Sequence, residues 1–124
     1  MPRLEAFAIE PVADLETLNA MRRVVAQLTL SEAVAHYIVD LVRATREHQS
    51  ILHGASPRAA NMLATGARAL AVLRGRDFVI PDDVKELYRP AMRHRVVLSP
   101  GAEVEGVTTD DALDQLLASV AAPR

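Results

Sequence analysis

The chain has 124 residues, of which 50% are hydrophobic and only 3% aromatic, with a formal net charge of −2. This length fits one domain, and its core must be built from Ala, Leu, Val and Ile, which favours packed helices over a β-sandwich. The lack of cysteine excludes disulfides and thiolate chemistry and is compatible with a cytoplasmic location. No apolar run reaches the roughly 20 residues of a membrane span. The net charge argues against non-specific binding to nucleic acid.

The charges are unevenly distributed along the chain. Residues 43–95 carry ten basic against five acidic residues, whereas residues 1–42 carry three against six and residues 96–124 carry one against five. All the basic residues except Lys85 are arginine, which binds phosphate and carboxylate through two parallel hydrogen bonds. A GC-rich genome explains most of this arginine bias.

Residues 1–13 contain two prolines and no helical period, so we expect a linker there, followed by a folded domain over residues 14–124. Asp14 and Ser31 can cap helices over about residues 14–28 and 31–46. Apolar residues recur at helical spacing in both: Leu15, Leu18, Met21, Val25 and Leu28 in the first, and Val34, Tyr37, Ile38, Leu41 and Val42 in the second. Residues 48–53 are predicted to form a polar loop.

Residues 54–59, Gly-Ala-Ser-Pro-Arg-Ala, have the pattern of a loop that turns into a helix. Gly54 can adopt backbone angles that other residues avoid, Ser56 is a good N-cap, and Pro57 fits the first helical position. Arg58 then lies in the first turn, at the positive end of the helix dipole, where a cation is disfavoured. An anion such as phosphate would explain this placement, and a solvated surface arginine is the alternative.

The third helix is predicted over about residues 57–74, with Met62, Leu63, Leu70 and Leu73 as apolar anchors. Its many alanines allow a neighbour to approach closely, so this helix should be central. Gly75 is a candidate left-handed C-cap.

A fourth helix should start at Pro81, with Asp82 and Asp83 complementing the dipole of its first turn. Pro90 should kink it or end it near Tyr88, before it resumes to about His94.

Residues 96–98 are predicted as a short strand, paired with the break at residues 28–30, and residues 99–101 as a turn. Thr108 or Thr109 should cap a last helix whose inward face is Leu113, Leu116, Leu117 and Val120. The fold class is therefore all-α, a small bundle of about five helices with at most a minimal two-stranded β pairing.

Several kinds of catalytic chemistry are missing from the sequence. There is no phosphate-binding loop of the G-x-x-x-x-G-K-[ST] type, no strand that ends in paired acids for magnesium, and no base near Ser56. His48 and His53 share a loop, but two ligands do not make a zinc site, so no metal site is predicted. The chain alone does not have the residues of an enzyme.

Several segments together point to a known family. They are residues 37–43 (Tyr-Ile-Val-Asp-Leu-Val-Arg), Thr45-Arg46, residues 54–59, residues 69–77 (Ala-Leu-Ala-Val-Leu-Arg-Gly-Arg-Asp), residues 81–84 (Pro-Asp-Asp-Val) and residues 93–95 (Arg-His-Arg). In this order, over roughly 110 residues, they make the chain resemble the C-terminal lid of MoxR-family AAA+ ATPases. One departure is Ile80, where many relatives have a threonine that could cap the next helix.

The resemblance implies a helical lid that packs over ATP held by a preceding α/β core, which would supply the phosphate loop and the magnesium acids. The chain would then be a separately made lid or a fragment of a longer protein. In such lids the arginine at the position of Arg58 is the sensor 2 residue, which reaches toward the γ-phosphate of ATP. Residues near Tyr37 lie close to the adenine in similar lids, but core packing is the favoured role for Tyr37.

The implied parent is an ATPase that forms hexameric rings and remodels partner proteins in a chaperone-like manner, often partners with von Willebrand factor A domains. Its cofactors would be ATP and magnesium, neither of which should bind this chain tightly alone. The alternative is a stand-alone helical adaptor that binds another protein through its basic middle. A DNA-binding helical domain is disfavoured by the net charge and the few aromatic residues.

Overall fold

The computed structural model describes residue 7 and residues 10–124. The elements of this part are, in chain order, α1 (Leu15–Gln27), α2 (Glu32–Ala44), β1 (Ile51–His53), α3 (Pro57–Leu73), α4 (Pro81–Met92), β2 (Val97–Leu98), α5 (Pro100–Val104) and α6 (Thr109–Ser119). The predicted all-α class with a two-stranded pairing is confirmed. Residues 99–101, predicted as a turn, instead begin the short α5, where the Ser99 hydroxyl accepts a hydrogen bond from the Ala102 N–H at 3.4 Å.

The predicted linker lies mostly outside the described residues, because residues 1–6 and 8–9 are not described. Residues 10–13 form neither helix nor strand. The division into a linker and a domain therefore stays a prediction.

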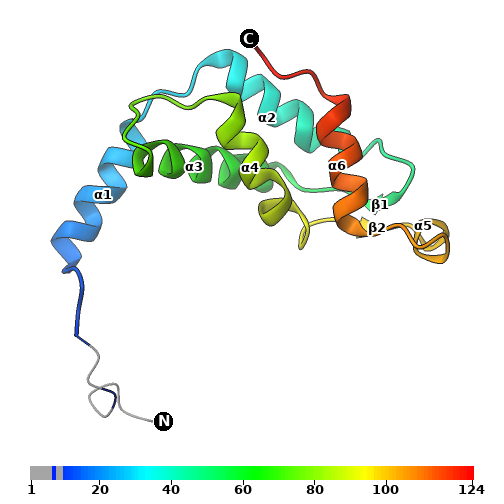
Figure 1. The fold of residues 1–124 in the computed structure, drawn as a ribbon, viewed down its shortest axis with the longest axis horizontal. Coiled ribbons are helices and arrows are strands. Elements are labelled where there is room, and N and C mark those ends of the chain that lie inside the picture. The colour runs from blue at the N-terminus through cyan, green and yellow to red at the C-terminus, as the bar shows by residue number, and fades with distance from the viewer. Residues whose placement is uncertain (1–6, 8–9) are drawn as a thin grey trace.

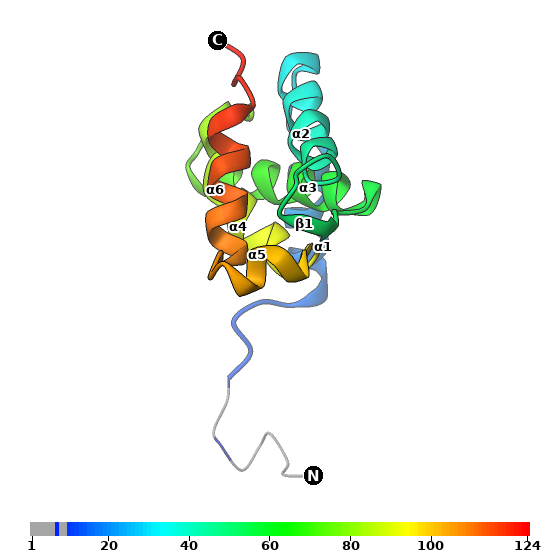
Figure 2. The ribbon, with the colours of Figure 1, turned by 90° about the vertical axis from the view of Figure 1, so that its right-hand side faces the viewer.

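Helix α3 is central, as its alanine content predicted. It packs against α2 on one side and α4 on the other (Figures 1 and 2). Helix α1 contacts the C-terminal half of α3, and α6 covers α4. Ala59, Ala67 and Ala71 are fully buried, so neighbouring side chains lie directly against the α3 backbone. Met62 and Leu73, predicted as anchors, are instead 47% and 84% exposed, since they lie off the face that meets α2 and α4.

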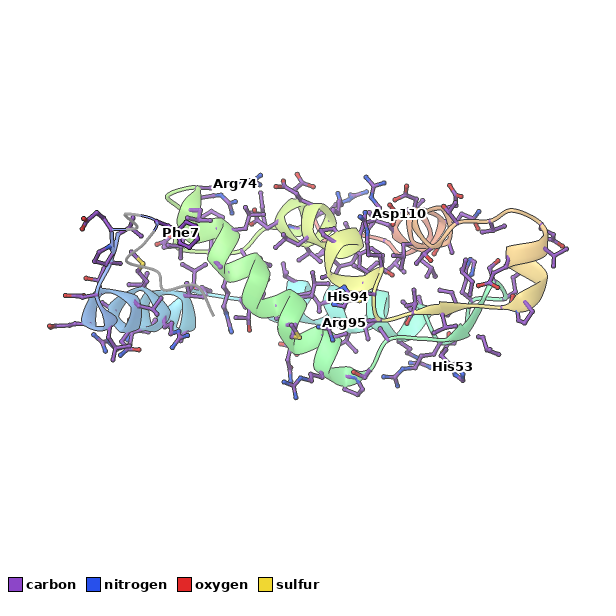
Figure 3. All side chains as sticks on the ribbon, turned by 90° about the horizontal axis from the view of Figure 1, so that it is seen from below. Phe7, His53, Arg74, His94, Arg95 and Asp110 are labelled. Atoms are coloured by element: carbon purple, nitrogen blue, oxygen red, sulfur yellow. The ribbon has the colours of Figure 1, made fainter. Side chains whose placement is uncertain are left out.

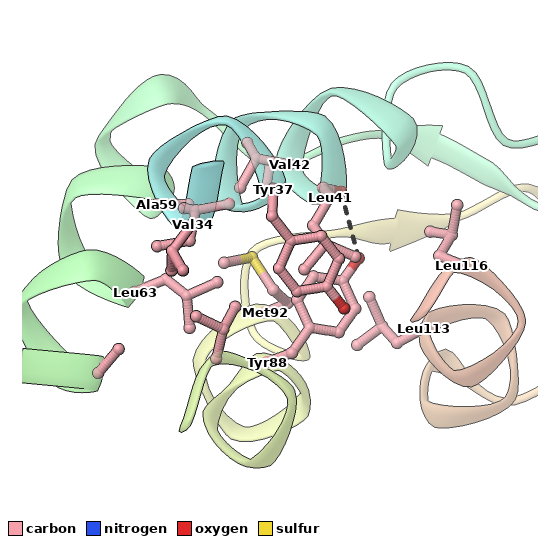
Figure 4. Packing of buried hydrophobic residues seen from close by; sticks show 14 of the residues in the cluster. Val34, Tyr37, Leu41, Val42, Ala59, Leu63, Tyr88, Met92, Leu113 and Leu116 are labelled. Atoms are coloured by element: carbon pink, nitrogen blue, oxygen red, sulfur yellow. Dashed lines mark hydrogen bonds between the residues drawn. The ribbon is translucent and has the colours of Figure 1, made fainter. Parts of the chain in front are cut away.

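The core is formed by apolar side chains from α2, α3, α4 and α6, as Figure 4 shows. All five residues of the predicted α2 stripe are buried. On α6, Leu113 and Leu116 are buried and Leu117 is half-buried against the same core, as is Val120 just after the helix. Burial of this apolar surface is the main force that holds the helices together.

Side chains cap three helices as the sequence predicts. Asp14 accepts from the Thr17 N–H at 2.7 Å, Ser31 from the Val34 N–H at 3.3 Å, and Thr108 from the Asp111 N–H at 3.1 Å. Each bond satisfies one of the N–H groups that a helix start leaves unpaired.

Helix α4 runs from Pro81 to Met92 and includes Pro90, so the expected end near Tyr88 is wrong. Proline removes one backbone donor and strains the preceding turn. Tyr88 and Met92, which flank Pro90, are both fully buried, and their packing keeps this stretch helical.

The two strands pair with each other, in an antiparallel register of Ile51 with Leu98 and His53 with Val97, with an irregularity between them. Two predictions were therefore wrong: residues 51–53 are strand rather than loop, and β2 does not pair with residues 28–30. Thr29 instead bridges to Phe78, with hydrogen bonds from Thr29 N–H to the Asp77 carbonyl and from Val79 N–H to the Thr29 carbonyl.

Helix α1 does not bury its apolar stripe. No residue between Leu15 and Gln27 is buried, and Leu15 is 70% exposed. Leu28, just after the helix, is the one member of the predicted stripe that reaches the core. The stripe stays exposed because α1 lies at the edge of the bundle, where its main contacts are with α3 (Figure 1).

Candidate functional site

The loop before α3 is held by Thr45, which is fully buried at the end of α2. Its hydroxyl donates to the Val42 carbonyl at 2.6 Å and accepts from the Ala55 N–H at 2.9 Å. A buried hydrogen bond of this kind is costly to lose, because the remaining partner stays unsatisfied. Thr45 thereby fixes the backbone two residues before the α3 start.

Gly54 serves a close approach, not an unusual backbone angle as the sequence suggested. Among the described glycines, positive φ occurs at Gly75, as predicted for the end of α3, and at Gly106. At Gly54 an added Cβ would lie 2.7 Å from the carbonyl carbon and oxygen of Thr45. The loop therefore rests directly on the end of α2, a fit that only a residue without a side chain allows.

Arg46 completes this support. Its Nε donates to the Ala55 carbonyl at 2.9 Å, so Thr45 and Arg46 together bind both backbone polar groups of Ala55. In the sequence these two residues stand out only as part of the family pattern, and their role in holding the loop was not predicted. The signal was a threonine and an arginine that directly follow the apolar stripe of α2.

The first turn of α3 is exposed. Pro57 occupies the first helical position, as predicted, but the Ser56 side chain makes no capping bond, and the Ala59 N–H reaches the Ser56 carbonyl at 2.8 Å instead. Arg58 is exposed and forms no hydrogen bond or ion pair with any residue that the structure describes. The positive helix end and an available guanidinium therefore lie together, a combination that suits an anion.

Arg58 lines an open pocket of about 320 Å³ together with Asn61, Met62 and Thr65. These residues follow Arg58 at helical spacing along one edge of α3. None of them carries a carboxylate, so no lining side chain competes with an anionic ligand for the Arg58 guanidinium.

Tyr37 lies in the core rather than on the surface beside Arg58 (Figure 4). It is 2% exposed, and burial raises the pKa of its hydroxyl. The neighbouring Tyr88 hydroxyl donates to the Leu41 carbonyl at 3.4 Å. Core packing, the favoured interpretation of Tyr37, is confirmed.

A second charged group joins the end of α3 to the start of α4. Asp83 has 0% exposure and accepts from Arg76 at 2.8 Å and from Arg74 at 3.2 Å, and its carboxylate also caps α4 through the Ile80 N–H at 3.0 Å. Burial raises the pKa of Asp83, but the hydrogen bonds from Arg76 and Ile80 outweigh it and hold the pKa below its usual value.

Asp82 and Asp83 both lie in the first turn of α4, as predicted, but the burial of Asp83 and its pairing with two arginines were not predicted. Asp82 is exposed and pairs with Lys85 at 2.9 Å, whereas Asp83 is a buried ion-pair centre. The Asp83 carboxylate satisfies the Ile80 N–H, whereas a threonine at position 80 would instead accept from an N–H of the first turn. The signal that was missed is the Arg-x-Arg pair shortly before the acids.

The histidines named as weak metal candidates do not converge with the Arg58 pocket. The His48 Nδ1 accepts from the Ser50 N–H at 3.2 Å, and His53 lies in β1 (Figure 3).

Within residues 7 and 10–124, the helices are too short or too polar to cross a bilayer.

Comparison with known proteins gives the family. The AAA lid domain model matches residues 43–116. The chain is 35% identical over 115 residues to the uncharacterized protein YeaC of Bacillus subtilis, covering 93% of this chain and 36% of YeaC. It is 34% identical over 116 residues to the chaperone MoxR1 of Mycobacterium tuberculosis, covering 86% of this chain and 31% of MoxR1. The chain thus spans about a third of the length of these curated relatives.

The fold of the chain also resembles that of a solved ATPase structure. The crystal structure of a Cytophaga hutchinsonii protein that is assigned as an ATPase superposes with a TM-score of 0.77 at 27% identity, and the match covers all of this chain and 50% of that one. The family model, the MoxR relatives and the shared helical architecture agree with one another. The chain belongs to the AAA lid domain family and is a lid domain of the MoxR-type AAA+ ATPases.

Proposed function

We propose that this lid closes over ATP held by a separate α/β core, and that Arg58 contacts the γ-phosphate as the sensor 2 residue. The observation that carries the proposal is Arg58 itself, exposed and without an acidic partner among the described residues, on a first helical turn whose preceding loop is held by Thr45 and Arg46. A guanidinium presented from a fixed backbone loses less freedom when it binds phosphate.

The core would supply the parts that this chain lacks. The curated relatives are about three times as long as the matched segment, which leaves room in them for an α/β core that binds ATP and magnesium. Closure of the lid would bring Arg58 to the negative charge that develops during phosphoryl transfer. Catalysis would then need both parts, with this chain contributing a phosphate contact.

The wider role proposed for the parent is ATP-driven remodelling of partner proteins in the cytoplasm. One relative is named a chaperone, which supports that part of the proposal. The direct partners would be the ATPase core of the same protein and the neighbouring subunits of a hexameric ring. Proteins with von Willebrand factor A domains are the proposed clients.

The test is the turnover number of the complete ATPase with Arg58→Ala. Hydrolysis should fall at least about tenfold, which corresponds to about 1.4 kcal/mol of barrier, while nucleotide affinity falls less. Arg58→Lys should recover only part of the rate, because an ammonium lacks the planar fork.

Arg89→Ala is the matched control, since Arg89 is an exposed arginine whose partner is Asp114 at 3.2 Å. This variant should hydrolyse ATP at the normal rate. Unchanged hydrolysis in Arg58→Ala would refute the sensor 2 role and favour the adaptor alternative. An equal loss in both variants would also refute it, by pointing to a general effect of arginine removal.

A further inference from the structure

Arg89 lies in the last turn of α4, and Arg93 and Arg95 lie just after the helix. The three arginines differ in their partners. Arg89 pairs with Asp114 at 3.2 Å and Arg93 with Asp110 at 2.8 Å, so α6 supplies a carboxylate to each. Arg95 has no acidic partner among the described residues and is directed toward α3 instead, away from Asp110 on α6 (Figure 3). The same short segment thus holds two neutralised arginines and one that is not.

The contact that Arg95 makes is a weak one. Its Nη2 lies 3.0 Å from the Sδ of Met62 on α3. A thioether is a poor hydrogen-bond acceptor, so this contact positions the guanidinium without neutralising it. Arg95 is itself anchored on both sides, because its N–H donates to the Met92 carbonyl at 2.8 Å and the next residue, Val96, is buried.

Met62 connects Arg95 to the Arg58 pocket. Met62 and Arg58 line the same pocket and are one turn apart on α3, about 6 Å along the axis. Side chains on a helix lean toward its N-terminus, so Met62 leans toward the turn that carries Arg58. Met62 therefore contacts Arg95 and lines a pocket with Arg58, two arginines that lie 37 positions apart in the sequence (58 and 95).

We infer that Arg95 is a second phosphate-binding arginine and contacts the triphosphate of ATP beside Arg58. This inference rests on the proposed function, because it assumes that the lid closes over ATP. Two forks that approach from α3 and from the end of α4 can hold a polyphosphate from two directions, which one arginine cannot do. No bond is made or broken by Arg95, whose role is to bind and orient the phosphates.

The test compares two substitutions at Arg95 that both keep an alkyl stem against Met62. Arg95→Gln removes the charge, and Arg95→Lys keeps it. In the complete ATPase, Arg95→Gln should weaken ATP binding about fivefold or more, as expected for loss of a charge-assisted hydrogen bond, and Arg95→Lys should lose less. The measurement is the dissociation constant of ATP, with the melting temperature recorded for each variant.

Arg93→Gln and Arg93→Lys are the matched controls, since Arg93 lies two residues away and is already paired with Asp110. Both should bind ATP within about twofold of the unchanged protein, as for exposed ion pairs. The inference is overturned if Arg95→Gln binds ATP as well as Arg93→Gln does. It is equally overturned if Arg95→Gln lowers the melting temperature more than Arg93→Gln does, because the contact is then structural.

The Arg58 measurement separates this inference from the proposed function. If Arg58→Ala lowers hydrolysis and Arg95→Gln behaves like its control, then Arg95 is not a ligand and the sensor 2 role stands. If Arg58→Ala has no effect, the proposed function fails, and the inference that depends on it fails too.

Discussion

The two ends of α3 hold arginines in opposite ways. At the C-terminal end, Arg74 and Arg76 converge on the buried carboxylate of Asp83. At the N-terminal end, the Thr45 hydroxyl and the Arg46 guanidinium hold the backbone of Ala55 without any carboxylate, and Arg58 is left exposed. The difference shows that arginine-rich composition alone does not identify a binding site; the neighbouring carboxylates decide which arginines are available.

The contrast also explains how one helix can combine stability with binding. The Asp83 centre joins α3 to α4 through charge pairs that are sheltered from water on the carboxylate side. The support from Thr45 and Arg46 contains no carboxylate, so nothing in it competes with an anion for Arg58. Breaking each end separately tests this division.

The largest effect is expected from Asp83→Ala. Loss of this carboxylate leaves Arg74 and Arg76 without their shared partner and removes the cap on the Ile80 N–H. Because both arginines are partly exposed, the free energy of unfolding should fall by about 2–3 kcal/mol, below the range for fully buried pairs. Urea denaturation of the chain measures this.

Two controls belong to that experiment. Asp82→Ala removes the neighbouring exposed acid and should cost less than about 0.5 kcal/mol. The second control is the pH dependence of the free energy of unfolding. The folded pKa of Asp83 is below its unfolded value of about 3.9, so the stabilisation by its carboxylate is fully present above that value. It is lost as the pH falls through the folded pKa. If the stability difference between the unchanged protein and Asp83→Ala does not shrink as the pH is lowered below the unfolded value, the ion-pair explanation is contradicted.

A smaller loss is expected from Thr45→Val at the other end. The substitution keeps the shape but leaves the buried Ala55 N–H without an acceptor, which should cost about 1–2 kcal/mol. Thr65→Val is the matched control, since the Thr65 hydroxyl is exposed and donates within α3 to the Asn61 carbonyl at 2.8 Å. Equal unfolding curves for the two variants would show that Thr45 does not hold the loop.

The smallest effect on stability is expected from Arg58→Ala. Arg58 has no partner in the part of the chain that the structure describes, so the free energy of unfolding should change by less than about 0.5 kcal/mol. Arg76→Ala, at the opposite end of α3, should destabilise the chain more, because it removes hydrogen bonds to Asp83. If Arg58→Ala destabilises the chain as much as Arg76→Ala, the two ends do not differ as described.

The sequence by itself determined most of the helices and where they begin. Asp14, Ser31 and Thr108 cap their helices as predicted, and the α2 stripe from Val34 to Val42 is buried as its spacing required. These features depend on contacts within one turn or on a 3.6-residue period, so they are readable without a partner. The sequence also contains the family pattern and Arg58, whose role in ATP hydrolysis stays a prediction.

Only the tertiary structure decided what lies against what. Helices α1 and α2 look alike in sequence, with a cap and an apolar stripe, yet α2 is buried and α1 is exposed because α1 lies at the edge of the bundle. Of two adjacent aspartates, Asp82 is exposed and pairs with Lys85, whereas Asp83 is buried and pairs with arginine. Arg95 contacts Met62, which lies 33 positions away in the sequence. Local patterns set the conformation of each helix, but burial, ion-pair partners and the availability of each arginine follow from contacts between residues distant in the chain.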